Sequence, residues 1–162
     1  MTKQHYKVEN YRLAESVGYL LKDALRALQD RLQVRFASHG FTFQQWIVLM
    51  HVRDGLASTI ADLCRETRHD SGAMTRLVDQ LEKRDLVQRK RNHKDRRVVE
   101  LQLTREGQRV ADSLKPLLVD TLNEALDGFT RTEVKELEGY LRRIGQTLRE
   151  PGAKTTALEK SA

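Results

Sequence analysis

The chain contains few of the features that mark secreted or membrane proteins. Its 162 residues include one cysteine, Cys64, so an intramolecular disulfide is excluded and a reducing compartment is favoured. No apolar run approaches the roughly 18 residues that a membrane-spanning helix needs, and residues 1–10 lack the apolar segment of a signal peptide. We therefore expect a cytoplasmic protein that has no membrane partner.

Sequence signatures of catalysis are also scarce. The chain has no HExxH or CxxC motif and no glycine-rich phosphate loop, so we expect no enzymatic activity, no cofactor and no metal. A zinc site built from some of the histidines remains an alternative. Cys64 is expected to be a buried, inert thiol rather than a redox switch. The histidines are scattered: they are His5, His39, His51, His69 and His93.

Positive charge is concentrated in one short segment. Residues 83–97 contain eight basic and two acidic residues, and so carry as much net charge as the whole chain, which is +6. Such a segment is either a solvated surface or a binding site for the phosphates of a nucleic acid. The choice between these readings depends on the fold around it.

Hydrophobic periodicity predicts helix over most of the chain. Capping boxes begin three of the helices, Asp70 caps a fourth, and Thr104 caps a fifth that is bent at Pro116 and runs to Gly128. The predicted helices cover residues 11–36, 43–53, 60–67, 71–84, 105–128 and 131–150. The boxes pair Thr42 with Gln45, Thr59 with Asp62, and Thr130 with Glu133.

Residues 86–103 interrupt the helical pattern. Segments 86–89 and 98–103 are short and rich in β-branched residues, and the second alternates with period two. A polar, charged tip at residues 92–96 separates them. This pattern predicts a β-hairpin with a long basic loop.

Two helices followed by a hairpin, over residues 60–103, have the layout of a winged helix-turn-helix, in which the second helix enters the major groove of DNA. The chain resembles the MarR family of bacterial transcriptional regulators. Five segments in the right order and spacing carry the resemblance: residues 41–46, 77–84, 86–89, 95–97 and 103–107. The family usually has glycine where this chain has Asp85. Aspartate tolerates a left-handed C-cap better than most residues, so we expect the turn to be kept.

The expected fold is mainly α with a small β-hairpin wing, a winged helix-turn-helix joined to a helical dimerisation region. Residues 37–103 form the DNA-binding domain, residues 1–36 and 104–150 form the dimerisation region, and residues 151–162 are a disordered tail. Leucines on more than one face of the terminal helices favour burial against a second copy. We therefore expect a homodimer.

The predicted DNA contacts lie on the second helix of the motif and on the hairpin. Arg76 can reach O6 and N7 of a guanine, and the short side chains before it suit phosphates or bases. The resemblance implies that Arg97 enters the minor groove and that Asp95 orients it. The alternatives are a solvated helix and an ordinary surface turn. The predicted contact residues are Ser71, Gly72, Thr75, Arg76, Arg91, Lys94, Asp95, Arg96 and Arg97.

The resemblance further implies an effector, a small aromatic acid or phenol. Its predicted site lies between the dimerisation helices and the DNA-binding domain, with Arg12 as the cation for a carboxylate. The alternative is that Trp46 and Met50 are plain core and that Arg12 is a surface charge. The predicted ligand-binding residues are Arg12, Ser16, Tyr19, Trp46 and Met50.

We expect these parts to form a homodimeric repressor, or less favourably an activator, that a small ligand releases from double-stranded DNA. The two-fold symmetry of a dimer predicts a palindromic operator with half-sites about 34 to 36 Å apart. The alternatives are a non-specific architectural DNA-binding protein and a metal- or redox-responsive regulator.

Overall fold

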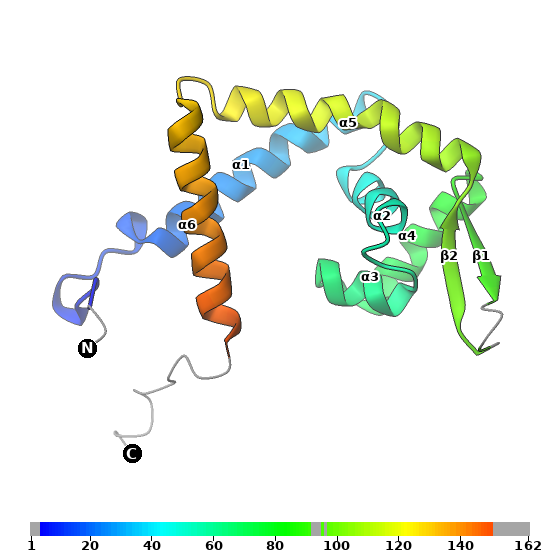
Figure 1. The fold of residues 1–162 in the computed structure, drawn as a ribbon, viewed down its shortest axis with the longest axis horizontal. Coiled ribbons are helices and arrows are strands. Elements are labelled where there is room, and N and C mark those ends of the chain that lie inside the picture. Colours follow the sequence, from blue (N-terminus) through cyan, green and yellow to red (C-terminus); the bar gives the residue numbers. More distant parts are fainter. Residues whose placement is uncertain (1–3, 92–94, 96, 151–162) are drawn as a thin grey trace, which may run out of the picture. The chain divides into compact units, whose positions relative to one another are not determined.

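A computed structural model describes residues 4–91, 95 and 97–150 (Figure 1). Lys94, Arg96 and the predicted tail at residues 151–162 lie outside the described residues. The chain divides into two compact units, residues 1–122 and 123–162. Two short 3-10 helices, η1 (Val8–Asn10) and η2 (Leu13–Glu15), precede the remaining elements, which are α1 (Val17–Ala37), α2 (Phe43–Arg53), α3 (Ile60–Thr67), α4 (Ser71–Lys83), β1 (Val87–Arg91), β2 (Val99–Leu103), α5 (Arg105–Ala125) and α6 (Arg131–Arg149). Among the described helices, none combines the length and apolarity needed to cross a membrane.

Side-chain caps fix where most helices begin. In each of the three predicted boxes, the threonine accepts the main-chain N–H of the third helical residue, and that residue's side chain accepts from the N-cap. Asp70 accepts the N–H of Ala73 at 2.8 Å, which starts α4 one residue later. The predicted starts of α2, α3, α4 and α6 are therefore confirmed.

The first long helix begins later than predicted. It starts at Val17 rather than at residue 11, because Ser16 is extended and accepts the N–H of Tyr19 as an N-cap. The hydroxyl of Tyr6 accepts the N–H of Val17 at 2.9 Å, which satisfies a second main-chain donor at this end. Arg12 consequently precedes the helix in an extended conformation.

Two apolar clusters build the core of residues 1–122, and α2 contributes to both. One cluster joins the end of α1 to α2 and α5, and there the indole N–H of Trp46 donates to the carbonyl of Ala111 at 3.0 Å. The other joins α2 to the winged helix-turn-helix. The first consists of Leu32, Phe36, Trp46 and Leu114, and the second is centred on Val48, Leu49, Leu63, Met74, Val78, Leu81, Leu86, Val87 and Leu101.

The hairpin is antiparallel and is tied to the helices at both ends. Val87 pairs with Leu103, and Arg91 pairs with Val99. The N–H of Leu101 donates to the carbonyl of Ser58 at 2.8 Å, which holds β2 against the segment before α3. The predicted mainly helical fold with a two-stranded wing is confirmed.

The turn before β1 meets the start of α5 at very close range. Asp85 has the expected left-handed conformation, with φ of 55°. Thr104 donates from its hydroxyl to the carbonyl of Asp85 at 2.6 Å and from its N–H to the carbonyl of Leu86 at 3.1 Å. A Cβ on Gly107 would lie 1.9 Å from that Leu86 oxygen, so only glycine fits here.

Helix α5 passes through Pro116 and ends at Ala125, three residues short of the predicted Gly128. In the unit of residues 123–162, α6 has no buried side chain. Its apolar side chains are instead exposed: Leu137, Tyr140, Leu141, Ile144 and Leu148.

We expect Gly107→Ala to lower the free energy of unfolding by at least about 2 kcal/mol, because the added methyl group meets main-chain atoms that cannot move aside cheaply. The matched control is Gly139→Ala in α6, where nothing lies within 4 Å of the added Cβ. This control should raise the stability by about 0.5 to 1 kcal/mol. Urea denaturation measures both; equal effects would show that the close approach is not tight in solution.

Candidate DNA-binding interface

Helix α4 is amphipathic, and its N-terminal half presents the predicted contact residues to solvent. Met74, Val78 and Leu81 are buried on one face. Ser71, Gly72 and Arg76 are exposed, whereas Thr75 is half-buried and donates from its hydroxyl to the carbonyl of Ser71 at 2.7 Å. The lone pairs of Thr75 remain available as acceptors.

Arg76 lies over the first turn of its own helix. Its Nη1 atom is 3.8 Å from the position that a Cβ on Gly72 would occupy. The pKa of Asp70 lies below its ordinary value, mainly because of the Ala73 N–H and in part because of the positive charge of Arg76. No hydrogen bond ties the Arg76 guanidinium to another described residue, so it can extend toward a ligand.

At the hairpin tip, Asp95 acts on Arg97 through the main chain. One carboxylate oxygen of Asp95 accepts the N–H of Arg97 at 3.0 Å, as in an Asx-turn. Arg91 and Arg97 are both exposed. The aspartate thus shapes the backbone that carries the arginine, rather than pairing with its guanidinium in a printed ion pair.

Arg89 joins the wing to the recognition helix, a role that the sequence analysis missed. From β1, its guanidinium donates to Asp79 at 2.6 Å and to Glu82, both on α4, and its N–H donates to Glu82 as well. The pKa of Arg89 is raised, chiefly by the hydrogen bond to Asp79. Two carboxylates on α4 three residues apart were the available sequence clue.

Not all of the positive charge in residues 83–97 is therefore free for DNA. Arg89 is held by α4. Arg84 donates to the carbonyl of Gly40 at 2.9 Å and lies 3.9 Å above the centre of the Phe41 ring. These two arginines stabilise the fold, and the exposed charge is concentrated toward the hairpin tip.

The structure does not bring the predicted ligand-binding residues together within one chain. Trp46 is only 3% exposed and is a core residue, hydrogen-bonded to Ala111 and packed on Phe36. Ser16 is the N-cap of α1, and twenty residues of helix, about 30 Å, separate it from Phe36. The prediction failed because it treated two stretches of apolar spacing as one site.

The remaining predicted residues fit this separation. Arg12 and Tyr19 are exposed near the start of α1, whereas Met50 packs on both core clusters. Cys64 is half-buried against the core. Within residues 4–91, 95 and 97–150, no three histidine, cysteine, aspartate or glutamate side chains gather as a metal would need.

Comparison with known proteins bears on this arrangement. The model of the MarR family matches residues 39–98, which contain α2, α3, α4 and β1. The E. coli protein MarR in its reduced form superposes with a TM-score of 0.71 at 27% identity, covering 80% of this chain and 96% of that one. The chain belongs to the MarR family.

This MarR-family chain is thus a DNA-binding transcriptional regulator rather than an enzyme. The transcriptional regulator SarZ of Staphylococcus aureus is 29% identical over 117 residues, which are 72% of this chain and 79% of SarZ. A variant of E. coli MarR solved with operator DNA superposes with a TM-score of 0.70 at 27% identity, covering 79% of this chain and 92% of that one. BpsR of Bordetella bronchiseptica, at 24% identity and a TM-score of 0.73, shares the fold over 83% of this chain and 96% of its own.

Salt titration separates contact from positioning at the wing. We expect Arg97→Ala to weaken operator binding by roughly 1 to 3 kcal/mol and to lower the slope of log K against log salt by about one unit. Arg89→Met should also weaken binding, because the wing loses its tie to α4, but should leave the slope unchanged. Fluorescence anisotropy measures both; a lower slope for Arg89→Met would mean that Arg89 contacts DNA, and an unchanged affinity for Arg97→Ala would contradict the minor-groove role.

Proposed function

We propose that this regulator is a homodimeric repressor that binds a palindromic operator through α4 and the β1–β2 hairpin and leaves it when a small molecule binds. One observation carries the DNA-binding part: exposed Arg76 and the exposed hairpin arginines stand on two elements that the Arg89 ion pairs hold together. A fixed spacing between two DNA-contacting elements is what sequence-specific docking requires.

The proposed division of labour follows the chemistry of each side chain. Arg76 reads a guanine in the major groove, while Ser71, Gly72 and Thr75 allow close approach to phosphates or bases. Arg97 enters the minor groove, where a flat, permanently charged guanidinium is favoured. Arg91, with Lys94 and Arg96 from the sequence prediction, supplies further phosphate contacts.

Exposed apolar surface supports the homodimer. Leu20 and Leu25 on α1 are 55% and 54% exposed, and α6 leaves its whole apolar stripe uncovered. Surfaces of this kind are characteristic of an interface. We assign residues 1–36 and 104–150 to dimerisation, with the end of α1 also packing on the DNA-binding domain at residues 37–103.

A small-molecule response is supported by the fold shared with BpsR, whose DNA binding is regulated by 6-hydroxynicotinic acid. For this chain, release from DNA requires that the ligand prefer a conformation of α4 and the hairpin that does not fit the operator. A hundredfold preference corresponds to nearly 3 kcal/mol of coupling, about the largest that is common.

The proposed readout by Arg76 can be tested on an operator selected from random DNA by the purified protein. We expect Arg76→Ala to lose discrimination between this operator and one with a mutated half-site, because a bidentate guanine contact contributes about 1 to 3 kcal/mol of discrimination. Gel-shift titration of both DNAs measures the ratio. Equal weakening on both would reduce Arg76 to a phosphate contact, and failure to select any sequence would favour a non-specific architectural protein.

The proposed dimer can be tested on α6. Leu141→Glu places a charge in the exposed apolar stripe and should shift the protein toward monomer in sedimentation velocity, with weaker operator binding. Lys135→Glu changes the opposite face of the same helix and should leave the dimer intact. A dimer that withstands Leu141→Glu would place the interface elsewhere.

A further inference from the structure

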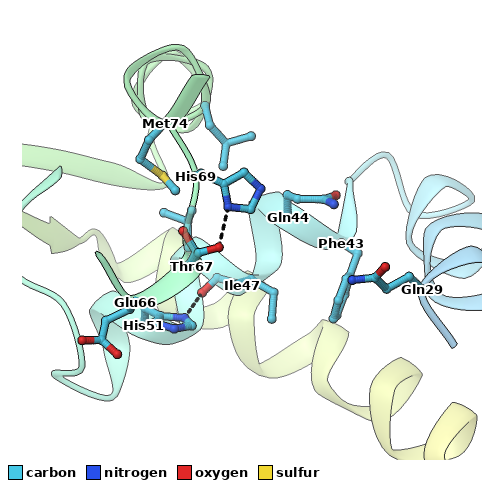
Figure 2. A pocket seen from close by; sticks show the side chains of 11 residues that line it. Gln29, Phe43, Gln44, Ile47, His51, Glu66, Thr67, His69 and Met74 are labelled. Carbon is cyan, nitrogen blue, oxygen red and sulfur yellow. Dashed lines mark hydrogen bonds between the residues drawn. The ribbon is translucent and has the colours of Figure 1, made fainter. Parts of the chain in front are cut away.

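A cavity of about 230 Å³ lies within the unit of residues 1–122, against the start of the recognition helix (Figure 2). Its walls come from α1, α2, the end of α3, the turn before α4, and α4 itself. Phe43, Ile47 and Met74 provide an apolar lining, and the side chains of Gln29 and Gln44 lie at the same opening. None of the five residues predicted to bind ligand lines this cavity.

Two imidazoles border the cavity, and each is fixed through one nitrogen. Nδ1 of His51 lies 2.8 Å from the carbonyl oxygen of Ile47, and Nδ1 of His69 lies 3.0 Å from that of Thr67. A carbonyl oxygen only accepts, so Nδ1 carries the proton and donates in both rings. In the neutral ring, Nε2 is then an acceptor, and no described side chain donates to it.

The charge around the cavity selects against anions. Neither lysine nor arginine is among the described residues that line it, so no permanent cation is present to pair with a carboxylate. The one lining carboxylate, Glu66, lies beyond His51 in the view of Figure 2 and is 3.8 Å from the guanidinium of Arg65. The polar groups therefore favour a neutral ligand that donates hydrogen bonds.

Size and shape narrow the ligand class further. A volume near 230 Å³ is below the roughly 300 Å³ at which drug-sized ligand sites begin, so it suits a molecule with one ring. The ring of Phe43 and the thioether of Met74 are good partners for an aromatic ligand, by ring contacts and by sulfur contacts respectively.

We propose that a neutral phenolic compound binds in this cavity and donates its hydroxyl proton to Nε2 of His51 or His69. The inference rests on the proposed ligand response and names its chemical class. It also replaces the acid expected from Arg12, which lies far along the chain from this site.

The cavity is well placed to act on DNA binding. His69 directly precedes Asp70, the N-cap of α4, and Met74 and Leu77 line the cavity from α4 itself. A ligand here touches α2 on one side and the first two turns of the recognition helix on the other. It therefore favours one position of α4, and operator and ligand must weaken each other equally if the operator needs another.

Calorimetry on the full chain tests the ligand class with four probes. Phenol and resorcinol should bind at least tenfold more tightly than anisole, which has the same ring without a donor, because a site built for a donor is left unpaired by the analogue that lacks it. Benzoate, an anion, should also bind at least tenfold more weakly. Equal binding of anisole, or tighter binding of benzoate, would overturn the proposal.

Variants test the site. His69→Phe and His51→Phe keep a flat ring but remove Nε2, and at least one should weaken phenol binding tenfold or more. His39→Phe is the matched control, since His39 is exposed and outside the cavity. Thermal unfolding followed by circular dichroism verifies that each variant is folded; wild-type phenol affinity in both folded cavity variants would refute the site.

Operator binding separates this inference from the proposed function. Phenol should weaken operator binding by the wild-type protein and by His39→Phe. If the protein binds its selected operator but no phenolic probe, the ligand class is wrong while the DNA-binding function stands. If no operator is bound, the proposed function itself fails, whatever the calorimetry shows.

Discussion

The contact between Gly107 and the carbonyl of Leu86 is the constraint on which the DNA-binding part depends. It brings the first turn of α5 onto the turn that begins the wing, closer than any side chain would permit. Thr104 adds two hydrogen bonds to the same turn, and Asp85 supplies the left-handed residue that makes it tight. The recognition helix, the wing and the long helix that follows them thus meet at one point.

Rigidity at that point gives the ion pairs of Arg89 their meaning. With the base of the wing fixed to α5, a second tie from β1 to Asp79 and Glu82 on α4 leaves the hairpin little freedom to swing. Helix α2 contributes in a different way, because its side chains belong to both apolar clusters of this unit. A displacement of α2 therefore reaches both the end of α1 and the winged helix-turn-helix.

Local chemistry explains what the sequence could predict. Capping residues act on main-chain groups three residues away, so the starts of α2, α3, α4 and α6 followed from short motifs. The start of α1 did not, because apolar spacing continues through residues that the Ser16 cap and the Tyr6 hydroxyl exclude from the helix. Exposure of Arg76 followed from periodicity alone, since the apolar residues of α4 occupy the other face.

Contacts between distant segments explain what the sequence could not predict. Arg89 looked like a free cation until the hairpin was seen folded against α4, where its partners stand seven and ten residues away. Trp46 looked like a ligand-binding aromatic, and only the packing of α5 shows that its N–H is already satisfied by Ala111. The cavity beside His69 escaped notice because it exists only where the turn before α4 approaches α2.

The bare apolar stripe of α6 has a consequence for the life of the protein in a cell. A helix of nineteen residues that buries none of its side chains gains little from its own chain and is marginal in water. With a second copy as its cover, its order depends on how much protein is present. Chains made in excess of their partners would then display a frayed C-terminal helix to proteases, so turnover would remove unpaired chains before complete dimers.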